Sequence, residues 1–437
     1  MKIKLLSVAL AIIFCCGLLA GCGGSEKKEV NITVKVPTIR MSPKNDSTVK
    51  DSYGFLVKAA EGFQKQYKDA NVKVKVTMFE ATEQMAEIDK TFGTPEAADV
   101  FYADFFNSAA YVHTGKVVPL DDIITPAMRK DIDSTFWQMC SFKGKIYQMP
   151  FLYRQNVMGY NKDLFKQCGL EQYVSDKNEV QNWSLAEWEY ILATLKQRLP
   201  ENKYPMMLYA ANNQGDTHIM TFIRSHGSEL FDKDGYFALE TPEAVAGLAW
   251  IKSLKDRGYC PPSPQSLVIS DCGQLFRNGQ LAMYFVNDAR GDLYDFPLGY
   301  VNFPGTGAKG ISTNFYTGFE VFDNGDAEKL AVAKAFVKYI YESDFIDYST
   351  GSIPCSKKVV EKYAKELPNI QLYIKNADTS VSITAGNPNW LGVREAFYPQ
   401  IKKLLMGECT PAEVAKRLDE NCNAAIKAGY EKSSLHK

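Results

Sequence analysis

The chain has 437 residues and an almost even charge balance, with 50 Lys and Arg against 51 Asp and Glu. This balance gives no support to a nucleic-acid partner or to electrostatic binding of a membrane surface. A chain of this length exceeds what one hydrophobic core usually serves, so we expect two lobes.

The N-terminus has the pattern of an export signal. Two lysines precede an apolar run over residues 5–18, which is too short to span a bilayer as a stable helix. Residues 19–22 read Leu-Ala-Gly-Cys and resemble the bacterial lipobox, whose cysteine is diacylated and becomes the new N-terminus. We therefore expect residues 1–21 to be a lipoprotein signal peptide and 22–30 to be the lipidated Cys22 with a flexible tether. The alternative is an ordinary signal with an incidental cysteine.

The rest of the chain alternates strand and helix patterns. Apolar residues recur at every second position over 32–36 and again over 72–78, and between these runs they recur at helical spacing over 53–67. Such a strand-helix-strand unit builds a parallel sheet. Farther on, three helix starts are predicted from a capping box at Ser184 and from the pairs Thr241-Pro242 and Thr410-Pro411. The pattern predicts an α/β protein.

Seven of the ten cysteines remain after Cys15, Cys16 and Cys22 are set aside. Their number is odd and they show no paired spacing, so we expect buried free thiols instead of a disulfide framework.

Motifs of catalysis and metal binding are missing from the sequence. None of the four histidines lies at metal-ligand spacing from another histidine or a cysteine, and no Gly-x-Ser-x-Gly, Cys-x-x-Cys or phosphate loop occurs. Residues 305–310 match the dinucleotide fingerprint, but a β-prone run follows where a helix should start, so we interpret them as a mobile loop. We expect no catalytic residue, no metal and no cofactor.

Five segments in order along the chain carry a family resemblance: residues 98–121, 144–165, 182–184, 276–283 and 390–396. They resemble the sugar-binding family of bacterial extracellular solute-binding lipoproteins of ABC importers, the group that includes maltose-binding protein. Each segment alone is a weak signal, whereas their shared order and spacing form a strong one.

The resemblance implies a two-lobed periplasmic-binding-protein-like fold (type II), with a ligand cleft between lobes that are joined by hinge segments. The lobes it implies are 31–152 plus about 296–345, and 153–295 plus about 346–437. A monomer of this kind captures a mono- or oligosaccharide by hinge closure and delivers it to an ABC permease. It does so outside the cytoplasm, tied to membrane lipid through Cys22. Two alternatives stay open: a secreted, lipid-anchored enzyme acting on glycans, and a sugar-sensing partner of a membrane kinase.

The resemblance also points to ligand contacts in the first lobe and the hinge. Asp104 and Phe105 follow a strand end at a family binding position, where an exposed turn is the alternative. Tyr153 and Arg154 stand at the hinge, where relatives often carry an acidic residue. An arginine there would favour an acidic sugar, and pairing with a nearby carboxylate is the alternative. Tyr316 lies on the β-prone run after the glycine loop. Arg40 and Asp51 border a loop that is a family contact zone.

In the second lobe the expected contacts are aromatic or planar and polar. Trp390 stands where the family's tryptophan stacks on the sugar, and a core tryptophan is the alternative. Asn212 and Gln214 offer amides that suit hydroxyl groups, although an Asn-rich turn is equally consistent with them. Asp288 and Arg290 stand where relatives often carry a tryptophan, so hydrogen bonds would replace stacking there; solvated surface residues are the alternative.

Overall fold

The computed structural model describes residues 27–80, 84–287, 294–307, 309–367, 369–384 and 386–433. Eleven strands form one mixed sheet whose main path runs β2-β1-β3-β11-β6-β10-β7, while β12, β13, β9 and β8 pair beside it. A separate hairpin joins β4 and β5. The strands are β1 (Glu29–Thr38), β2 (Asn71–Glu80), β3 (Val100–Asp104), β4 (Ser141–Phe142), β5 (Lys145–Ile146), β6 (Met149–Asn161), β7 (Val180–Gln181), β8 (Tyr204–Met206), β9 (Leu281–Val286), β10 (Leu298–Val301), β11 (Ser312–Val321), β12 (Ile353–Pro354) and β13 (Ser380–Val381).

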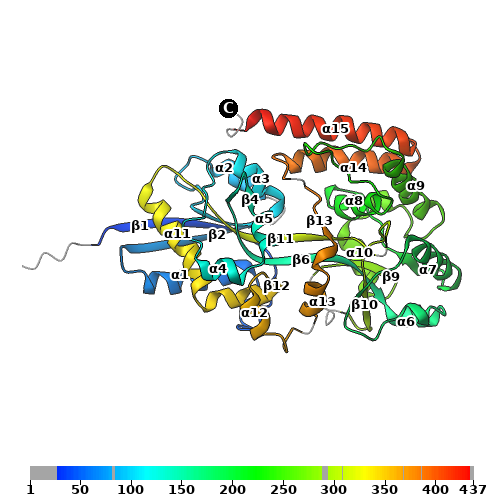
Figure 1. Ribbon diagram of the computed structural model, residues 1–437, viewed down its shortest axis with the longest axis horizontal. Coiled ribbons are helices and arrows are strands. Elements are labelled where there is room, and N and C mark those ends of the chain that lie inside the picture. Colours follow the sequence, from blue (N-terminus) through cyan, green and yellow to red (C-terminus); the bar gives the residue numbers. More distant parts are fainter. Residues whose placement is uncertain are drawn as a thin grey trace, which may run out of the picture.

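The first lobe is built on the predicted strand-helix-strand unit. β1 and β2 pair in parallel along their whole lengths, and β3 lies on the other side of β1. Helix α1 (Ser52–Gln66) connects β1 to β2, and it packs with α11 (Ala327–Glu342) on one face of the sheet, whereas α2 (Gln84–Thr91) and α3 (Phe105–His113) lie on the other face (Figure 1). Phe55 of α1 stacks on Phe151 in the core between them. The buried apolar residues of this lobe belong to a hydrophobic cluster that continues into the second lobe.

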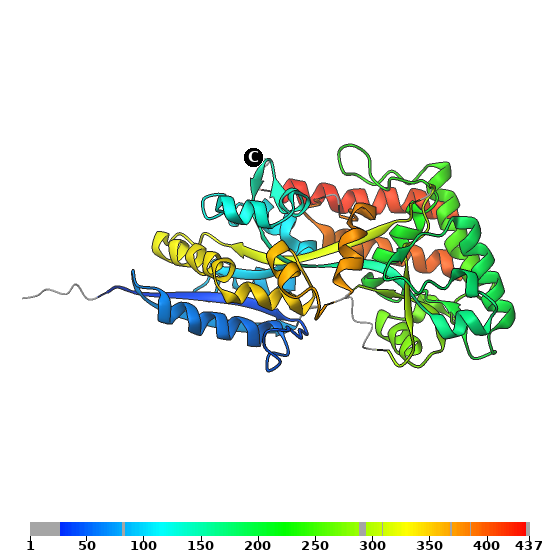
Figure 2. The ribbon, with the colours of Figure 1, turned by 60° about the horizontal axis from the view of Figure 1, so that its bottom comes forward.

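Two strands cross between the lobes. The first half of β6 pairs with β11 up to Asn156, and its second half, from Val157, pairs with β9 and β10. Figures 1 and 2 show β6 (teal) and β11 (yellow) running through the middle, between the blue and cyan elements of one lobe and the green elements of the other. At the crossing Gln155 donates to Ser312 and to the Asn376 carbonyl, at 2.9 Å each. The predicted two-lobed α/β fold is confirmed.

The second lobe is mainly helical around β8, β9 and β10. Its helices start where the sequence predicted: Ser184 and Thr410 each form a capping box, and Thr241 caps a helix with proline at its first position. The remaining α-helices of the described chain are α4 (Pro126–Asp131), α5 (Ser134–Met139), α6 (Lys162–Gln167), α7 (Leu185–Arg198), α8 (Asp216–Arg224), α9 (Pro242–Asp256), α10 (Ile269–Arg277), α12 (Lys357–Lys362), α13 (Ile370–Lys375), α14 (Trp390–Met406) and α15 (Pro411–Lys432).

The C-terminal part of the chain contacts both lobes. The 3₁₀ segment Asp344–Gly351, β12 and α12 pack against β6, α11 and α4, although the sequence assigned everything from about 346 to the second lobe. The last helix, α15, packs on α14 and α9, yet its end reaches the first lobe, where the Ser433 hydroxyl lies 2.6 Å from Nδ1 of His113 (Figure 1). The C-terminal segments therefore hold the lobes together in addition to the crossing strands.

Two further predictions are confirmed. The seven cysteines of the described chain are all free and buried. After Gly305–Gly310 the chain enters β11, not a helix, so the dinucleotide fingerprint has no structural counterpart. None of the helices in the described ranges is both long and apolar enough to cross a bilayer.

A close backbone approach between β11 and β6 in the first lobe gives a test of this architecture. A Cβ on Gly318 of β11 would clash with the carbonyl of Met149, where the register of β11 and β6 shifts. Gly318→Ala should therefore destabilise the protein by about 1–3 kcal/mol in urea unfolding. Gly307→Ala is the control, because nothing lies within 4 Å of the added methyl there. Equal stability of the two variants would contradict the strand register described.

Candidate ligand-binding cavity

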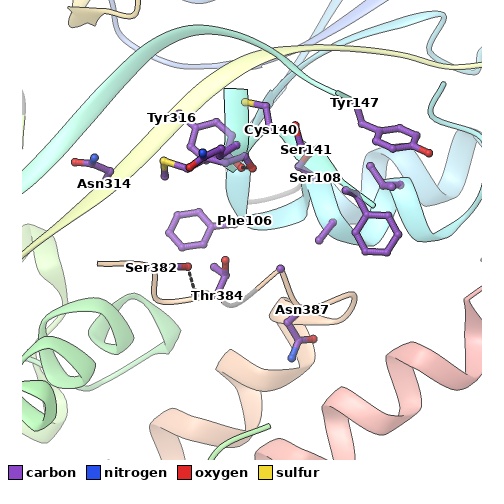
Figure 3. A pocket seen from close by; sticks show the side chains of 16 residues that line it. Phe106, Ser108, Cys140, Ser141, Tyr147, Asn314, Tyr316, Ser382, Thr384 and Asn387 are labelled. Atoms are coloured by element: carbon purple, nitrogen blue, oxygen red, sulfur yellow. Dashed lines mark hydrogen bonds between the residues drawn. The ribbon is translucent and has the colours of Figure 1, made fainter. Parts of the chain in front are cut away.

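A cavity of about 370 Å³ lies where the two lobes meet beside the crossing strands (Figure 3). Its walls come from three parts of the chain: helix α3, residues 138–142 with Tyr147, and the approach segment to α14, which we define as residues 382–384 and 386–389. Strand β11 forms its floor. The lining residues are Phe106, Ser108, Ala109, Val112, Gln138, Met139, Cys140, Ser141, Phe142, Tyr147, Asn314, Tyr316, Ser382, Thr384, Gly386 and Asn387.

The α3 wall is positioned by a helix cap. β3 ends at Asp104, whose carboxylate accepts a hydrogen bond from the backbone N–H of Phe106 at 3.1 Å and so starts α3. The Phe106 ring then lies 4.9 Å from the ring of Phe315 on β11. The guanidinium of Arg394, on α14, also lies over the Phe106 ring, at 4.9 Å from its centroid. Phe106 is thus a contact between the lobes as well as a cavity wall.

Strand alternation decides which side chains of β11 form the floor. Asn314 and Tyr316 are two residues apart, so they share the face that the cavity occupies. The Tyr316 hydroxyl donates to the carbonyl of Met139 at 2.8 Å, which ties the floor to the 138–142 wall. Asn314 is only 7 % exposed, and its Oδ1 has no hydrogen-bond partner among the described residues. A buried amide oxygen of this kind is available to a ligand donor.

The approach segment forms the wall that belongs to the second lobe. Asn387 accepts a hydrogen bond from the N–H of Asn389 at 2.8 Å, and Asn389 in turn caps α14 through the N–H of Gly392. Gly386 has a φ of 68°, in the left-handed region that favours glycine. Thr384 and Ser382 face Phe106 from this segment (Figure 3). The wall is therefore held by the N-terminus of α14.

Charged groups are kept out of the cavity. Among the described residues that line it, every side chain is aromatic, aliphatic, sulfur-containing, amide or hydroxyl. The nearby Arg394 is paired with the fully buried Asp216, with 2.7 Å between Nε and Oδ2. Glu320, on β11, is fully buried, and burial raises its pKa to about 8, against an opposing effect of the Ser108 hydroxyl. The arrangement suits an uncharged ligand with apolar faces and hydroxyl groups.

Comparison with known proteins assigns the family. The family described as bacterial extracellular solute-binding protein matches residues 58–371. The chain belongs to this family.

The relatives it matches are distant but span most of the chain. The diacetylchitobiose binding protein DasA of Streptomyces coelicolor is 23 % identical over 446 residues, covering 98 % of this chain and 99 % of DasA. A protein of Brucella abortus that carries a binding-protein name is 24 % identical and covers 72 % of this chain and 77 % of its own length.

Solved structures share the fold. An ABC substrate-binding protein of Listeria monocytogenes in complex with cycloalternan superposes with a TM-score of 0.71 at 18 % identity, covering 92 % of this chain and 99 % of that one. The maltose-bound MalE3 of T. maritima gives 0.70 at 17 % identity, with 90 % and 99 % covered. The fold is therefore that of two-lobed, MalE-like binding proteins.

Of the residues predicted as contacts in the first lobe and hinge, Tyr316 lines the cavity. Asp104 caps α3 at its edge, and the side chain of Phe105 lies outside the described part of the structure. Tyr153 pairs with Tyr316 across the strands but is 2 % exposed and packs on Phe136. Arg154 lies opposite Phe315 on the other face of the sheet, half-buried and without an ion pair to the described residues.

Arg40 and Asp51 form an isolated bridge, and Asp51 caps α1 by accepting from Gly54 at 2.8 Å. In this structure they close the loop after β1 and do not reach the cavity lining.

The second-lobe candidates are more dispersed. Trp390 is 1 % exposed and packs near Phe231, outside the cavity lining, so its stacking role stays a prediction. Asn212 caps the short turn before α8, accepting from the N–H of Gln214. Asp288, Arg290 and the lipidation residue Cys22 lie outside the described residues.

The sequence reasoning missed several residues that border the cavity. Phe106 is one residue beyond a predicted contact, and Arg394 is one helical turn beyond Trp390, so both were within reach of the family motifs. The 138–142 wall and the approach segment carried no motif. Within the described ranges no group of histidine, cysteine or carboxylate side chains could hold a metal ion.

The buried carboxyl beneath the cavity gives a pH test. Because burial raises the pKa of Glu320 from 4.5 to about 8, the folded state keeps a proton that the unfolded chain releases. The free energy of unfolding of the wild type therefore decreases as the pH rises from about 4.5 to about 8. The free energy of unfolding of Glu320→Gln should therefore rise relative to that of the wild type by up to about 1.4 kcal/mol per pH unit in that range. Urea unfolding at several pH values measures the difference.

Glu361→Gln, a substitution of the same kind at an exposed position of α12, is measured beside it as the control. A pH-independent difference between Glu320→Gln and the wild type would refute the raised pKa.

Proposed function

We propose that this protein captures an uncharged sugar in the interlobe cavity and delivers it to an ABC permease. The observation that carries the proposal is the lining: half-buried rings, amides and hydroxyls from both lobes, without a charged side chain among the described residues. The names of relatives support it. DasA is named for diacetylchitobiose, an arabinooligosaccharide-binding protein of Halalkalibacterium halodurans is 24 % identical over 164 residues, and the solved structures above hold cycloalternan and maltose.

The lining fits the chemistry of a sugar ring. A pyranose has apolar C–H faces that pack on aromatic rings such as Phe106, and a rim of hydroxyl groups that pair with amides such as Asn314. A ligand held by walls from both lobes binds the closed form better than the open one, and only such a difference in affinity shifts the equilibrium between them. Moving a population from mostly open to mostly closed requires about 5 kcal/mol of differential affinity. The loaded protein would then differ in shape from the empty one, and a permease could recognise that shape.

The expected contacts outside the lining stay part of this proposal. Asp104 and Trp390 stand at the N-termini of α3 and α14; α3 lines the cavity, and α14 follows the approach segment that lines it. Rearrangement of either helix end on binding would bring these side chains to the ligand.

We also propose that Cys22 carries a diacylglycerol and that the residues from Cys22 up to the start of β1 tether the lobes to the outer face of the cell membrane. The predicted tether of residues 22–30 is too long by two residues, because β1 begins at Glu29 and pairs with β2 from there. Two acyl chains anchor a protein stably, whereas one is marginal. Tethering keeps the binding lobes within reach of the permease.

Asn314→Ala tests the cavity. Because Asn314 Oδ1 has no partner among the described residues, the variant should unfold at nearly the wild-type temperature. If a sugar hydroxyl donates to this oxygen, affinity should fall about tenfold, which corresponds to 1.4 kcal/mol. Calorimetry with a sugar chosen from a thermal-shift screen over neutral sugars, acidic sugars and amino acids measures the effect.

Tyr190→Ala is the control for calorimetry, because this tyrosine is 51 % exposed on α7, away from the lining. A stabilising amino acid instead of a sugar, or unchanged affinity in Asn314→Ala, would count against the proposal. Shortened products after incubation with glycans would replace it by an enzymatic function.

Cys22→Ser tests the anchor. Expressed in a bacterial host, the wild type should sediment with membranes and the variant should be released, as measured by immunoblotting of the two fractions. Ser25→Ala, three residues on, should remain with the membranes. Retention of Cys22→Ser in the membrane fraction would exclude lipid attachment at this residue.

A further inference from the structure

A second hollow, of about 580 Å³, opens on the surface next to the cavity. It lies between the β4–β5 hairpin of the first lobe and, in the second lobe, α15 and the loop before α9. Its lining consists of Phe142, Lys143, Asp234, Tyr236, Lys427, Tyr430 and Glu431. We call it the outer groove. Like the cavity, it is made of residues from both lobes.

The outer groove and the cavity share a wall. Phe142 lines both of them. A row of rings packs from Phe142 to Tyr236. His113, which is buried and outside the groove lining, lies 4.8 Å from Phe142 and 5.7 Å from Tyr430, and Tyr430, in the lining, lies 6.3 Å from Tyr236. Figure 3 places Tyr147 at the end of the cavity that is nearer to α15. A ligand that extends beyond the cavity at this end would meet the aromatic row.

The groove also has the chemistry of a sugar subsite. Phe142, Tyr236 and Tyr430 are each half-buried, so part of each ring is exposed for packing against C–H faces. The exposed Lys143, Asp234, Lys427 and Glu431 surround them with two positive and two negative groups. Such a rim offers donors and acceptors to hydroxyls without favouring a charged ligand.

The hairpin turn helps to form this surface. Lys143 has a φ of 48°, in the left-handed region, and Gly144 follows with 78°, so the two-residue turn between β4 and β5 is tight. The turn leaves the Lys143 ammonium over the ring of Phe142, at 5.5 Å from its centroid. The edge of the groove is therefore held in place by a short, paired hairpin.

We propose that the outer groove binds the outer rings of an oligosaccharide whose first two rings occupy the cavity. The inference rests on the proposed sugar-binding function and adds to it the length of the ligand. It makes Tyr236 a residue that determines specificity for length, because it lines only the groove.

The test is affinity as a function of chain length. Calorimetry with the full-length protein would use two neutral series, maltose to maltotetraose and chitobiose to chitotetraose. For the series that binds, wild-type affinity should rise at least tenfold from the disaccharide to the tetrasaccharide. Tyr236→Ala should abolish that rise while leaving the disaccharide affinity within twofold. Tyr236→Phe, which keeps the ring, should restore most of it.

The controls separate the two proposals. Tyr190→Ala should behave as the wild type for every sugar. Lys143→Ala, which changes an exposed groove side chain, should lower tetrasaccharide affinity alone and covers the case in which Tyr236→Ala does not fold. The groove proposal is wrong if wild-type affinity is independent of oligosaccharide length, or if Tyr236→Ala lowers affinity equally at all lengths. If neither series binds although the screen yields another neutral sugar, the groove proposal alone fails. If no sugar of the screen binds, the sugar-binding function itself fails.

Discussion

Two strands must serve both lobes at once, and this constraint governs the rest of the molecule. β6 hydrogen-bonds to β11 along one half and to β9 and β10 along the other, so the backbone ladder of one lobe continues into the other. Strand alternation then fixes which side chains of β11 face the cavity. The crossing is also polar: Gln155 and Asn156 bond to Ser312 and Thr313 instead of packing into an apolar core. Bending there would exchange directional hydrogen bonds.

The sequence predicted best what is encoded locally. Capping residues at Ser184, Thr241 and Thr410 sit within three or four residues of the groups they bond, so their patterns can be found without knowing the fold. The strand-helix-strand unit was predictable for the same reason. The two lobes were predicted from the five segments that resemble the solute-binding family in the same order along the chain. The cavity could not be predicted in this way, because Phe106, Met139, Asn314 and Thr384 meet only through tertiary structure.

Trp390 illustrates the limit of motif transfer. A tryptophan at the start of a helix has the same sequence pattern whether it stacks on a ligand or packs in the core. The exposed fraction of its side chain, which bears on this choice, is known only from the structure. Arg154 is a second case. Its position on β6 suggested an acidic ligand, but strand alternation places it on the face away from the described cavity lining. The electrostatic character of the cavity follows from partners that sequence does not reveal, such as Asp216 for Arg394.

The seven unpaired thiols bear on how such a protein matures outside the cytoplasm. All of them are buried, and burial raises the pKa of those of Cys140 and Cys355 well above the ordinary value, so the reactive thiolate is scarce in the native state. An oxidising compartment threatens such a chain only while it is unfolded. Rapid folding after export, without any oxidoreductase, would thus be the chain's own protection against scrambled cross-links.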